Sequence, residues 1–202
     1  MESTSTRNPK HTRAALLDAA FKEIYENGYQ AASLERILAN TNLTKGALYH
    51  HFPNKHALGI AVIREIITDQ IIAEHAGPLM ETDDPIPVML AHIDQCNDES
   101  ADGELEFGCP LHNLVQEMSP LDEEFRNSLQ EIQFTWQRIL SEALARGQAR
   151  GNVREDLDCD EVALFLVAAV EGCKGTTKSL QSTETFRSCM NQLKRYVETL
   201  RP

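Results

Sequence analysis

Small, basic and aromatic side chains follow one another between Thr44 and Lys55, and this mixture suits contact with a phosphate backbone. Lysines neutralise phosphate charge, and hydroxyl groups donate hydrogen bonds to phosphate oxygens. Gly46 costs a helix about 1 kcal/mol relative to Ala, but its missing side chain lets the backbone approach a DNA groove closely. Lys55 stands at the expected start of a helix, where the dipole disfavours a cation unless a phosphate docks there. The pattern therefore predicts a surface that binds DNA.

These residues also have plainer interpretations. Tyr49 could pack between two helices, and His50 with His51 could form a solvated helix end. Lys45 could be an ordinary solvated lysine, although its neighbours disfavour that interpretation. The combination of all these residues in register favours DNA binding over the plainer interpretations.

Cys109 and His112 form a second group with possible chemistry. Cys109 lies at the expected start of a helix, where the dipole would lower the pKa of its thiol. The spacing of three residues puts His112 on the same helix face. The alternative, which we favour, is that Cys109 is a small buried apolar side chain. No third orienting group, oxyanion-hole motif or diagnostic ligand spacing with His92 is visible, so we predict no catalytic residue, metal or cofactor.

Helical periodicity recurs along the chain, and no stretch alternates with a period of two, which predicts an all-α fold. The predicted helices cover residues 9–27, 33–39, 44–51, 54–76, 86–97, 110–118, 121–146, 159–178 and 183–200. Side chains suited to capping helix N-termini precede the early helices, among them Asn8, Ser33, Thr44 and Asn54. The polar, glycine-containing segment 97–108 is predicted to be a mobile loop.

The helices at 33–39 and 44–51 are predicted to form a helix-turn-helix. Its apolar inner face would consist of Leu34, Ile37, Leu43, Leu48 and Phe52. The turn calls for a residue that tolerates a positive φ, and Asn42 is the best choice other than glycine. The second helix would then present its small, polar and basic face to a major groove.

Two motifs carry a family resemblance. They are Ser33-Leu34-Glu35-Arg36-Ile37 and Leu43-Thr44-Lys45-Gly46-Ala47-Leu48-Tyr49-His50-His51-Phe52-Pro53-Asn54-Lys55-His56-Ala57-Leu58. Through them, residues 10–58 resemble the DNA-binding module of the TetR/AcrR family of transcriptional repressors. The sequence departs from the family's pattern at Asn42, where Gly is usual, and at His56, where Glu is common. The second departure puts one local salt bridge in doubt.

The resemblance implies an all-α protein of about nine helices that forms an Ω-shaped dimer. Residues 1–54 would be a three-helix DNA-binding domain, and residues 55–202 a larger effector-binding and dimerisation domain. The DNA-contacting residues that the resemblance implies are Ser33, Thr44, Lys45, Gly46, Ala47, Tyr49, His50 and Lys55. An N-terminal arm carrying Arg7 and Lys10 would reach along the DNA.

The charge distribution suits contact with DNA at one end only. The formal net charge of −12 argues at first sight against nucleic-acid binding. Residues 1–60, however, hold seven Lys/Arg against five Asp/Glu, or +2, while the remaining 12 basic and 26 acidic residues give −14. An acidic body would repel DNA and orient its approach to the basic front piece. A generic acidic cytosolic protein would carry the same charge, so charge alone does not decide.

The composition, with 42% apolar and 25% charged residues, is ordinary for a globular protein. The longest apolar run is Val162–Val170, whereas a bilayer span needs about 20 residues, so we predict no membrane partner. The N-terminal residues lack the apolar stretch of a secretory signal. The five cysteines are odd in number and widely spaced, which indicates reduced thiols and a cytoplasmic location.

The run Val162–Val170 predicts a helix that is covered on both sides, because a helix that is apolar all round cannot lie on a surface. The family pairs its last two helices into a dimer bundle. The dimer-interface candidates are Leu166, Val170, Cys173, Phe186, Met190, Leu193 and Val197. A two-fold homodimer would set its recognition helices about 34–36 Å apart and read a palindromic operator. A large core within one monomer is the alternative.

Polar and reactive side chains among apolar ones indicate where a small effector would bind. These candidates are His92, Cys96, Cys109, His112, Asn113, Gln137 and Glu171. In the family, such a ligand shifts the dimer away from the spacing that fits DNA. The segment 107–114 also resembles the Gly-Cys segment of members that sense electrophiles, so an electrophile or oxidant could be the signal. A small helical ligand-binding protein or enzyme with structural N-terminal helices is the alternative function. The operator, the effector and the choice between repression and activation stay open.

Overall fold

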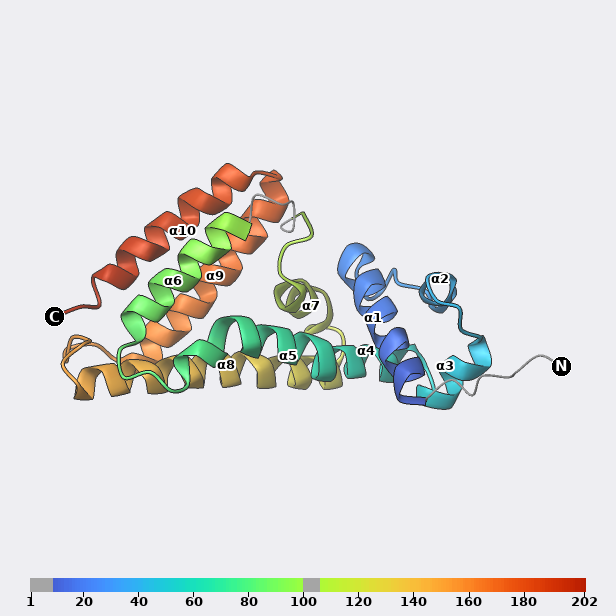
Figure 1. The fold of residues 1–202 in the computed structure, drawn as a ribbon. Helices are drawn as coiled ribbons and strands as arrows, with labels where there is room; N and C mark the ends of the chain where they lie inside the picture. The colour runs from blue at the N-terminus through green and yellow to red at the C-terminus, as the bar shows by residue number, and fades with distance from the viewer. Residues whose placement is uncertain (1–8, 100–105) are drawn as a thin grey trace.

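The computed structural model describes residues 9–99 and 106–202, and every regular element in those ranges is a helix (Figure 1). A head at one end of the molecule consists of α1 (Pro9–Asn27), α2 (Leu34–Ala39) and α3 (Lys45–His51). The body consists of α4 (Lys55–Val62), η1 (Ile63–Ile67), α5 (Thr68–Ile71), η2 (Ile72–Ala76), η3 (Gly77–Leu79), α6 (Pro85–Glu99), α7 (Pro110–Met118), α8 (Glu123–Ala149), α9 (Cys159–Leu180) and α10 (Thr183–Glu198). The predicted all-α fold is confirmed.

One continuous helical path leads from the head through the body. It begins at Lys55, where the side chain of Asn54 accepts a hydrogen bond from the backbone N–H of Ala57 at 2.8 Å. The junctions between α4, η1, α5 and η2 all keep right-handed helical backbone angles, so the path does not break. The predicted helix over 54–76 is therefore confirmed, and η3 extends the path to Leu79. Figure 1 shows this path running beside α8.

The head folds around an apolar core and one buried carboxylate. The core consists of Leu16, Leu17, Ala20, Ile24, Ile37, Leu48 and Phe52. Buried Glu23 on α1 accepts hydrogen bonds from Nε of Arg36 at 2.5 Å and from the backbone N–H of Ser33 at 3.3 Å, which fixes α2 against α1. As predicted, Ser33 and Thr44 cap α2 and α3, because each hydroxyl accepts a backbone N–H of the following turn.

The turn between α2 and α3 differs from the prediction. Among the described residues other than glycine, only Gln181 has a positive φ, so Asn42 does not adopt the left-handed conformation. The hydroxyl of Thr41 instead donates to a carbonyl of α2 at 3.0 Å and accepts from the backbone N–H of Leu43 at 3.3 Å. A threonine side chain therefore shapes this turn, and no left-handed residue is needed there.

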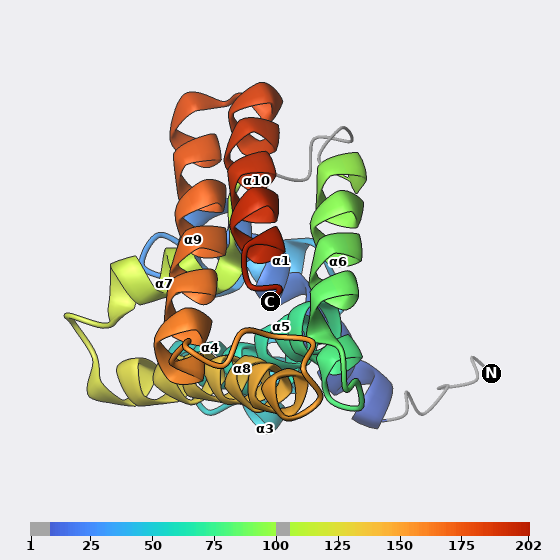
Figure 2. The same ribbon diagram turned by 90° about the vertical axis from the view of Figure 1, so that its left-hand side faces the viewer.

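The body packs α6, α9 and α10 side by side above α8 (Figure 2). The buried face of α8 includes Phe125, Leu129, Ile132, Trp136, Leu140 and Ala143, which recur at helical spacing. The chain reverses between α9 and α10 at Gln181, which takes the left-handed conformation at the end of α9. The last two helices are thereby held antiparallel to each other.

The predicted dimer-interface candidates face the interior of the single chain, which corrects that prediction. Leu166, Cys173, Phe186, Met190, Leu193 and Val197 are buried, and Val170 is half-buried. The exposed side of α9 carries Leu164, Phe165, Ala168 and Gly172. The apolar run does have two apolar sides, but α8 and α10 pack against the side to which the candidates belong, and residues of α6 line a small cavity together with Leu166 and Val170.

Several helix ends differ by a few residues from the prediction. α7 has the predicted bounds, whereas α6 continues to Glu99, and α8 starts at Glu123 behind the cap residue Asp122. Asn8, Arg7 and residues 100–105, half of the loop predicted at 97–108, lie outside the described residues. None of the helices within the described ranges combines the length and the apolarity that crossing a bilayer requires.

Candidate DNA-binding head and its links to the body

The outer face of α3 is a free surface of small, polar and basic residues. Lys45, Gly46, Tyr49 and His50 are exposed, while Leu48 anchors the helix in the core. A Cβ added at Gly46 would find its nearest neighbour, a hydroxyl oxygen, at 3.7 Å, so the backbone there is open to a partner. Tyr49 is 52% exposed, which excludes the interpretation that it packs between helices. The face thus has the chemistry and the accessibility that a major-groove contact requires.

Lys45 is paired with a carboxylate on the neighbouring helix. Its Nζ lies 2.9 Å from Oε1 of Glu35, and both side chains are largely exposed. The hydrogen bond from the ammonium lowers the pKa of Glu35 and raises that of Lys45, so both groups are charged at neutral pH. Because exposed ion pairs contribute little to stability, this pair can open at small cost when a phosphate approaches.

Lys55 does not project freely from its helix, contrary to the phosphate site that the sequence predicted. Its Nζ donates to the carbonyl oxygen of Gln30 at 3.1 Å and lies 4.7 Å from the ring centroid of Tyr29. Desolvation in this position lowers the pKa of Lys55. In this structure the ammonium therefore stabilises the start of the loop between α1 and α2. We call this start, residues 28–30, the hinge loop.

The hinge loop is also bound from the body side. The carboxylate of Glu117 on α7 accepts the backbone N–H groups of Tyr29 at 2.9 Å and of Gln30 at 2.8 Å. Nearby, the hydroxyl of Tyr25 on α1 donates to the carbonyl oxygen of Gly108 at 2.7 Å. Head and body are therefore joined by hydrogen bonds as well as by the covalent path into α4.

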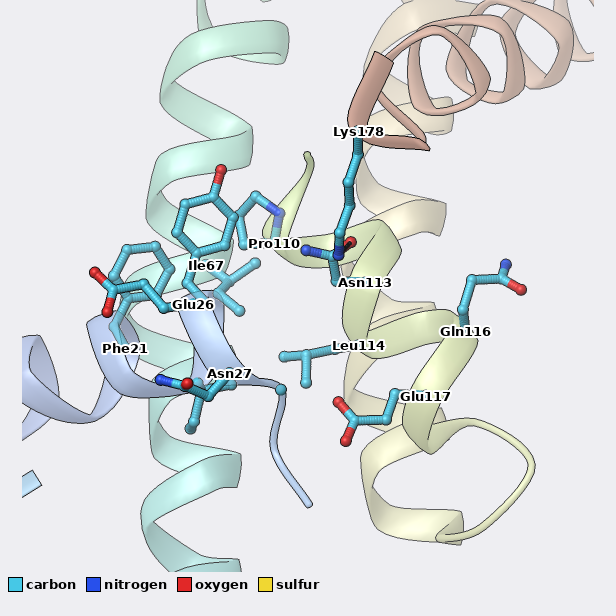
Figure 3. A pocket seen from close by; sticks show the side chains of 13 residues that line it. Phe21, Glu26, Asn27, Ile67, Pro110, Asn113, Leu114, Gln116, Glu117 and Lys178 are labelled. Carbon is cyan, nitrogen blue, oxygen red and sulfur yellow. Dashed lines mark hydrogen bonds between the residues drawn. The ribbon is translucent and has the colours of Figure 1, made fainter. Parts of the chain in front are cut away.

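A cleft of about 480 Å³ opens beside these contacts, between α1 and the helices α7 and α9 (Figure 3). Of the predicted effector candidates, only Asn113 lines it. Its Oδ1 accepts from Nζ of Lys178 at 3.0 Å, and its Nδ2 donates to the carbonyl oxygen of Phe107 at 2.7 Å. Asn113 thus binds α7 to α9 and to the segment before α7.

His56, the second departure from the family's pattern, forms a pair of its own. Its Nε2 lies 3.1 Å from Oδ2 of Asp122, the cap of α8. Behind it, the ring of Tyr29 packs against Phe125 with centroids 4.5 Å apart. A Cβ at Gly59 would come within 2.6 Å of the Tyr29 ring and 2.9 Å of the Phe125 ring, so this close packing requires glycine. The local contact that this departure put in doubt is thus present as a pair between His56 and Asp122.

A chain of polar side chains crosses the interior of the body at the far end of the helical path. Nζ of Lys174 lies 3.4 Å from Nε2 of His75, and Nδ1 of His75 lies 2.6 Å from Nε2 of His92. Sγ of Cys96 lies 3.6 Å from the same His92 nitrogen. Because an ammonium can only donate, Nε2 of His75 accepts and its Nδ1 carries the proton that it donates to His92. The ring of His75 also stacks on Trp136, with centroids 4.7 Å apart.

The polar chain borders a small apolar cavity of about 50 Å³. His75 and His92 contribute its polar edge, and Trp136 lies in its wall. Four of the residues predicted for the dimer interface line this cavity: Leu166, Val170, Leu193 and Val197. Of the predicted effector candidates, His92 therefore faces this cavity, and Cys96 contacts His92 without lining the cavity. Half-buried Gln137 lines neither this cavity nor the cleft.

Cys109 is a buried side chain, which is the alternative that the sequence analysis favoured, and it does not have the activated thiol that a helix start could give. Its side chain is 2% exposed, and burial raises the pKa of the thiol above its ordinary value. The desolvation of the thiolate outweighs the stabilising effects of the helix N–H groups and of Lys174. Nδ1 of His112 instead lies 3.7 Å from Oε2 of buried Glu171, which also accepts from Gln133 at 3.3 Å.

Acidification is expected to destabilise the protein through His75. Burial and the neighbouring Lys174 lower its pKa from 6.5 to about 2, so the folded state holds this ring neutral. Below pH 6.5 the unfolded chain binds a proton there that the folded chain does not, and stability is lost as the pH falls. Between pH 7 and pH 5 the free energy of unfolding should fall by about 2 kcal/mol more in the wild type than in His75→Phe.

Urea unfolding at the two pH values measures this difference. Phe keeps an aromatic ring against Trp136, and the five histidines other than His75 and its hydrogen-bond partner His92 keep their surroundings in both proteins, so their contributions cancel. An equal loss of stability in both proteins would show that His75 is not held neutral by the fold.

Sequence reasoning missed His75, Lys174 and Glu117. A signal for His75 existed, because Ile71, His75 and Leu79 recur at a spacing of four and all are buried. A histidine at that position on a buried helix face indicates an interior polar contact. Glu117 carried no such signal, because its partners are backbone groups of a distant loop.

Comparison with known proteins identifies the family. Residues 85–193, more than half of the chain, match the family model described as the tetracyclin repressor-like C-terminal domain. The chain belongs to the TetR family. Residues 16–62 match a second TetR model, described as bacterial regulatory proteins of the tetR family. These residues begin within α1 and end with α4, so they include the whole of α2 and α3.

Two curated relatives in the TetR family are transcriptional regulators. The chain is 29% identical over 160 residues to the HTH-type transcriptional repressor DhaR of Mycobacterium sp. (strain GP1). The aligned residues cover 79% of each chain. It is 30% identical over 155 residues to the transcriptional regulator AcuR of Cereibacter sphaeroides, covering 74% of this chain and 68% of that one. TetR-family proteins are regulators, not enzymes, and the chain is a DNA-binding transcriptional regulator.

Solved TetR-family structures share the fold. A regulatory protein TetR from Rhodobacter sphaeroides superposes with a TM-score of 0.79 at 26% identity, covering 90% of this chain and 96% of that one. A TetR regulator from Chloroflexus aurantiacus superposes with a TM-score of 0.84 at 23% identity, covering 96% and 97%. The architecture of head and body is therefore that of the TetR family.

Proposed function

We propose that the protein is a homodimeric repressor that binds a palindromic operator and leaves it when a small molecule binds in the body. Residues 1–54 act as the DNA-binding domain, and residues 55–202 bind the effector and form the dimer. The observation that carries the proposal is the exposed face of α3, which combines Lys45, Gly46 and Tyr49 on one side of a short helix. Its partners are double-stranded DNA, a second copy of the chain and a small effector.

The residues of the head divide into those that read bases and those that bind phosphates. Lys45, Tyr49 and His50 are proposed to reach the groove, and Gly46 with Ala47 allows the backbone to approach. Ser33, Thr44 and Lys55 are proposed to face the DNA backbone. The Ser33 and Thr44 hydroxyls already cap helices, and each can still donate its proton to a phosphate oxygen. Lys55 must first leave the carbonyl of Gln30.

The dimer is proposed to form through the exposed side of α9. Leu164 is 55% exposed and Phe165 is 49% exposed, and Ala168 and Gly172 continue the same stripe. The ring of Phe165 meets Tyr196 of α10 edge to face, with centroids 4.7 Å apart, so both helices contribute. Large apolar side chains at this spacing favour a second copy of the same stripe as their cover.

The effector is proposed to enter the apolar cavity beside His75 and His92. Apolar walls with a few polar groups at one edge are typical of small-molecule sites, and a cavity of about 50 Å³ must widen to admit such a ligand. The cavity adjoins η2, which belongs to the helical path that starts behind α3, so a ligand there can displace the head. Burial of the Cys109 thiol argues against an electrophile or oxidant as the signal. The protein is proposed to act in the cytoplasm, without a cofactor, metal or catalytic activity.

Selection of random DNA duplexes by the purified protein tests the proposal. The wild type is expected to enrich a palindrome, and the double variant Lys45→Ala/Tyr49→Ala is expected to enrich none. Arg138→Ala, which removes an exposed cation from the body, serves as the control and should enrich the same palindrome. If the wild type enriches no sequence at low salt and neutral pH, the repressor proposal is wrong. The cavity of the body would then support the alternative of a ligand-binding protein.

A further inference from the structure

We propose that Glu117 is the positioning residue that fixes the angle of the head on the body and thereby the distance between the two recognition helices. The inference rests on the proposed homodimeric repressor. It assigns to α7 a role in operator recognition, although α7 touches neither the recognition helix nor the exposed stripe of α9.

Both partners are suited to the contact between Glu117 and the hinge loop. The carboxylate accepts two consecutive backbone N–H groups, at 2.9 Å and 2.8 Å, and such charge-assisted hydrogen bonds are among the stronger ones in proteins. Gly28 makes the approach possible, since its φ is +80° and a Cβ there would lie 3.1 Å from Oε2 of Glu117. Figure 3 shows the Glu117 side chain extending from α7 toward the end of α1.

The hinge loop moves with the head because the head holds it firmly. Its first residue, Gly28, donates to the carbonyl of Ile24, and Ala32 donates back to the carbonyl of Gly28 at 3.0 Å. In the DNA-free protein, Nζ of Lys55 also donates to the carbonyl oxygen of Gln30, in the peptide unit that follows the N–H group held by Glu117. A displacement of Glu117 therefore moves the hinge loop and the head together.

At its other end, α7 is bound to the helix that carries the proposed dimer stripe. Asn113 accepts from Lys178 of α9, and Leu111 and Leu114 anchor α7 in the core of the body. The carbonyl of Ser119 accepts from Arg126 of α8 at 3.0 Å, which fixes the end of α7. The contacts thus form a continuous route from α9 through α7 to the hinge loop.

Several contacts hold the head on the body. The chain enters α4 covalently, Arg13 of α1 pairs with Glu65 of η1, and the hydroxyl of Tyr25 donates to the carbonyl oxygen of Gly108. Glu117 adds the contact that binds backbone N–H groups of the hinge loop to α7, and without it the head can change its angle about the remaining contacts. In a two-fold dimer, that angle sets the separation of the recognition helices, which must match about one turn of DNA.

The experiment compares wild type, Glu117→Gln and Glu117→Ala, with Glu131→Gln as the control. Gln has nearly the size of Glu but lacks the charge, and its NH₂ group cannot accept the second N–H. Glu131 is an exposed carboxylate on α8, so its replacement makes the same change in charge. Amide hydrogen exchange of residues 28–32 in the free protein is expected to be about tenfold faster in both Glu117 variants. Thermal unfolding and circular dichroism check that each variant is folded.

The second measurement uses the palindrome selected by the wild type and versions with one or two base pairs inserted at its centre. Each added pair moves the half-sites by about 3.4 Å and turns them by about 35°. Wild type and the control should lose affinity steeply on insertion. In the Glu117 variants, the affinity for the original site divided by the affinity for the lengthened site is expected to fall about tenfold. The reason is that a head that can pivot tolerates the wrong spacing of half-sites.

Unchanged discrimination between the original and lengthened sites in both Glu117 variants would overturn the inference, even if hydrogen exchange were faster. Unchanged exchange at residues 28–32 would overturn it as well, because the hinge loop would then be held without the carboxylate. A wild type that selects no duplex would instead refute the proposed function and, with it, any role of Glu117 in half-site spacing.

Discussion

Replacing Phe165 with Asp is expected to convert the proposed dimer into monomers and to weaken binding to the proposed operator about 100-fold or more. Phe165 lies in the exposed stripe of α9 together with Leu164, Ala168 and Gly172. A carboxylate at the centre of this stripe would face its own copy across the two-fold axis and would lose its water there. Without the dimer, each head binds one half-site, and the gain from linking two binding events is lost.

The oligomeric state is measured by sedimentation, and operator affinity by titration of the selected palindrome at fixed salt. Phe134→Asp is the matched control, since Phe134 is 64% exposed on α8, away from the α9 stripe. It should leave both the dimer and the operator affinity unchanged. If Phe134→Asp dissociates the dimer and Phe165→Asp does not, the interface lies on α8 and the proposed stripe is wrong.

The sequence predicted those features of the head that depend on neighbouring residues. Ser33, Thr44 and Asn54 cap the helices that follow them, because a cap contacts backbone groups only a few residues away. The exposed face of α3 follows from helical periodicity once Leu48 is placed in the core. Local rules therefore located α3, the helix that is proposed to enter the DNA groove.

The proposed dimer face could not be derived from the same rules. The run Val162–Val170 is apolar on every side, so periodicity does not tell which side faces the protein's own core. That choice depends on where α6, α8 and α10 lie, and their positions are set by contacts between distant parts of the chain. The sequence analysis therefore assigned Leu166 and Val170 to the dimer, whereas Leu164 and Phe165 are the exposed pair.

The contacts between head and body escaped prediction for a different reason. Glu117 binds backbone N–H groups, and a backbone partner leaves no mark in the sequence. Lys55 was predicted to bind a phosphate from its place at a helix start, but the carbonyl of Gln30, far away along the chain, is near enough to bind it first. For Cys109, burial outweighs the local helix effect. In each case a tertiary neighbour outweighs a local tendency.

Phe125→Ala is expected to lower the free energy of unfolding by about 3–5 kcal/mol, the range for large aromatic truncations in a core. Phe125 is fully buried at the start of α8, its ring packs against Tyr29 of the hinge loop, and it meets His56 at 5.4 Å. The packing is tight enough that Gly59 leaves no room for a Cβ, so the structure cannot easily collapse into the space left by the ring. Urea unfolding followed by circular dichroism measures the loss.

Phe134→Ala on the same helix removes an equal volume from an exposed position, and it should change the stability by no more than about 0.5 kcal/mol. The comparison separates packing from helix propensity, which both substitutions alter in the same way. Domains of this kind are stable by about 5–15 kcal/mol, so the loss at Phe125 would be a large share of the total. Because the ring touches both head and body, the hinge loop should also exchange its amides faster in Phe125→Ala. A loss below about 1 kcal/mol would mean that the contact between Tyr29 and Phe125 is not what holds the head against α8.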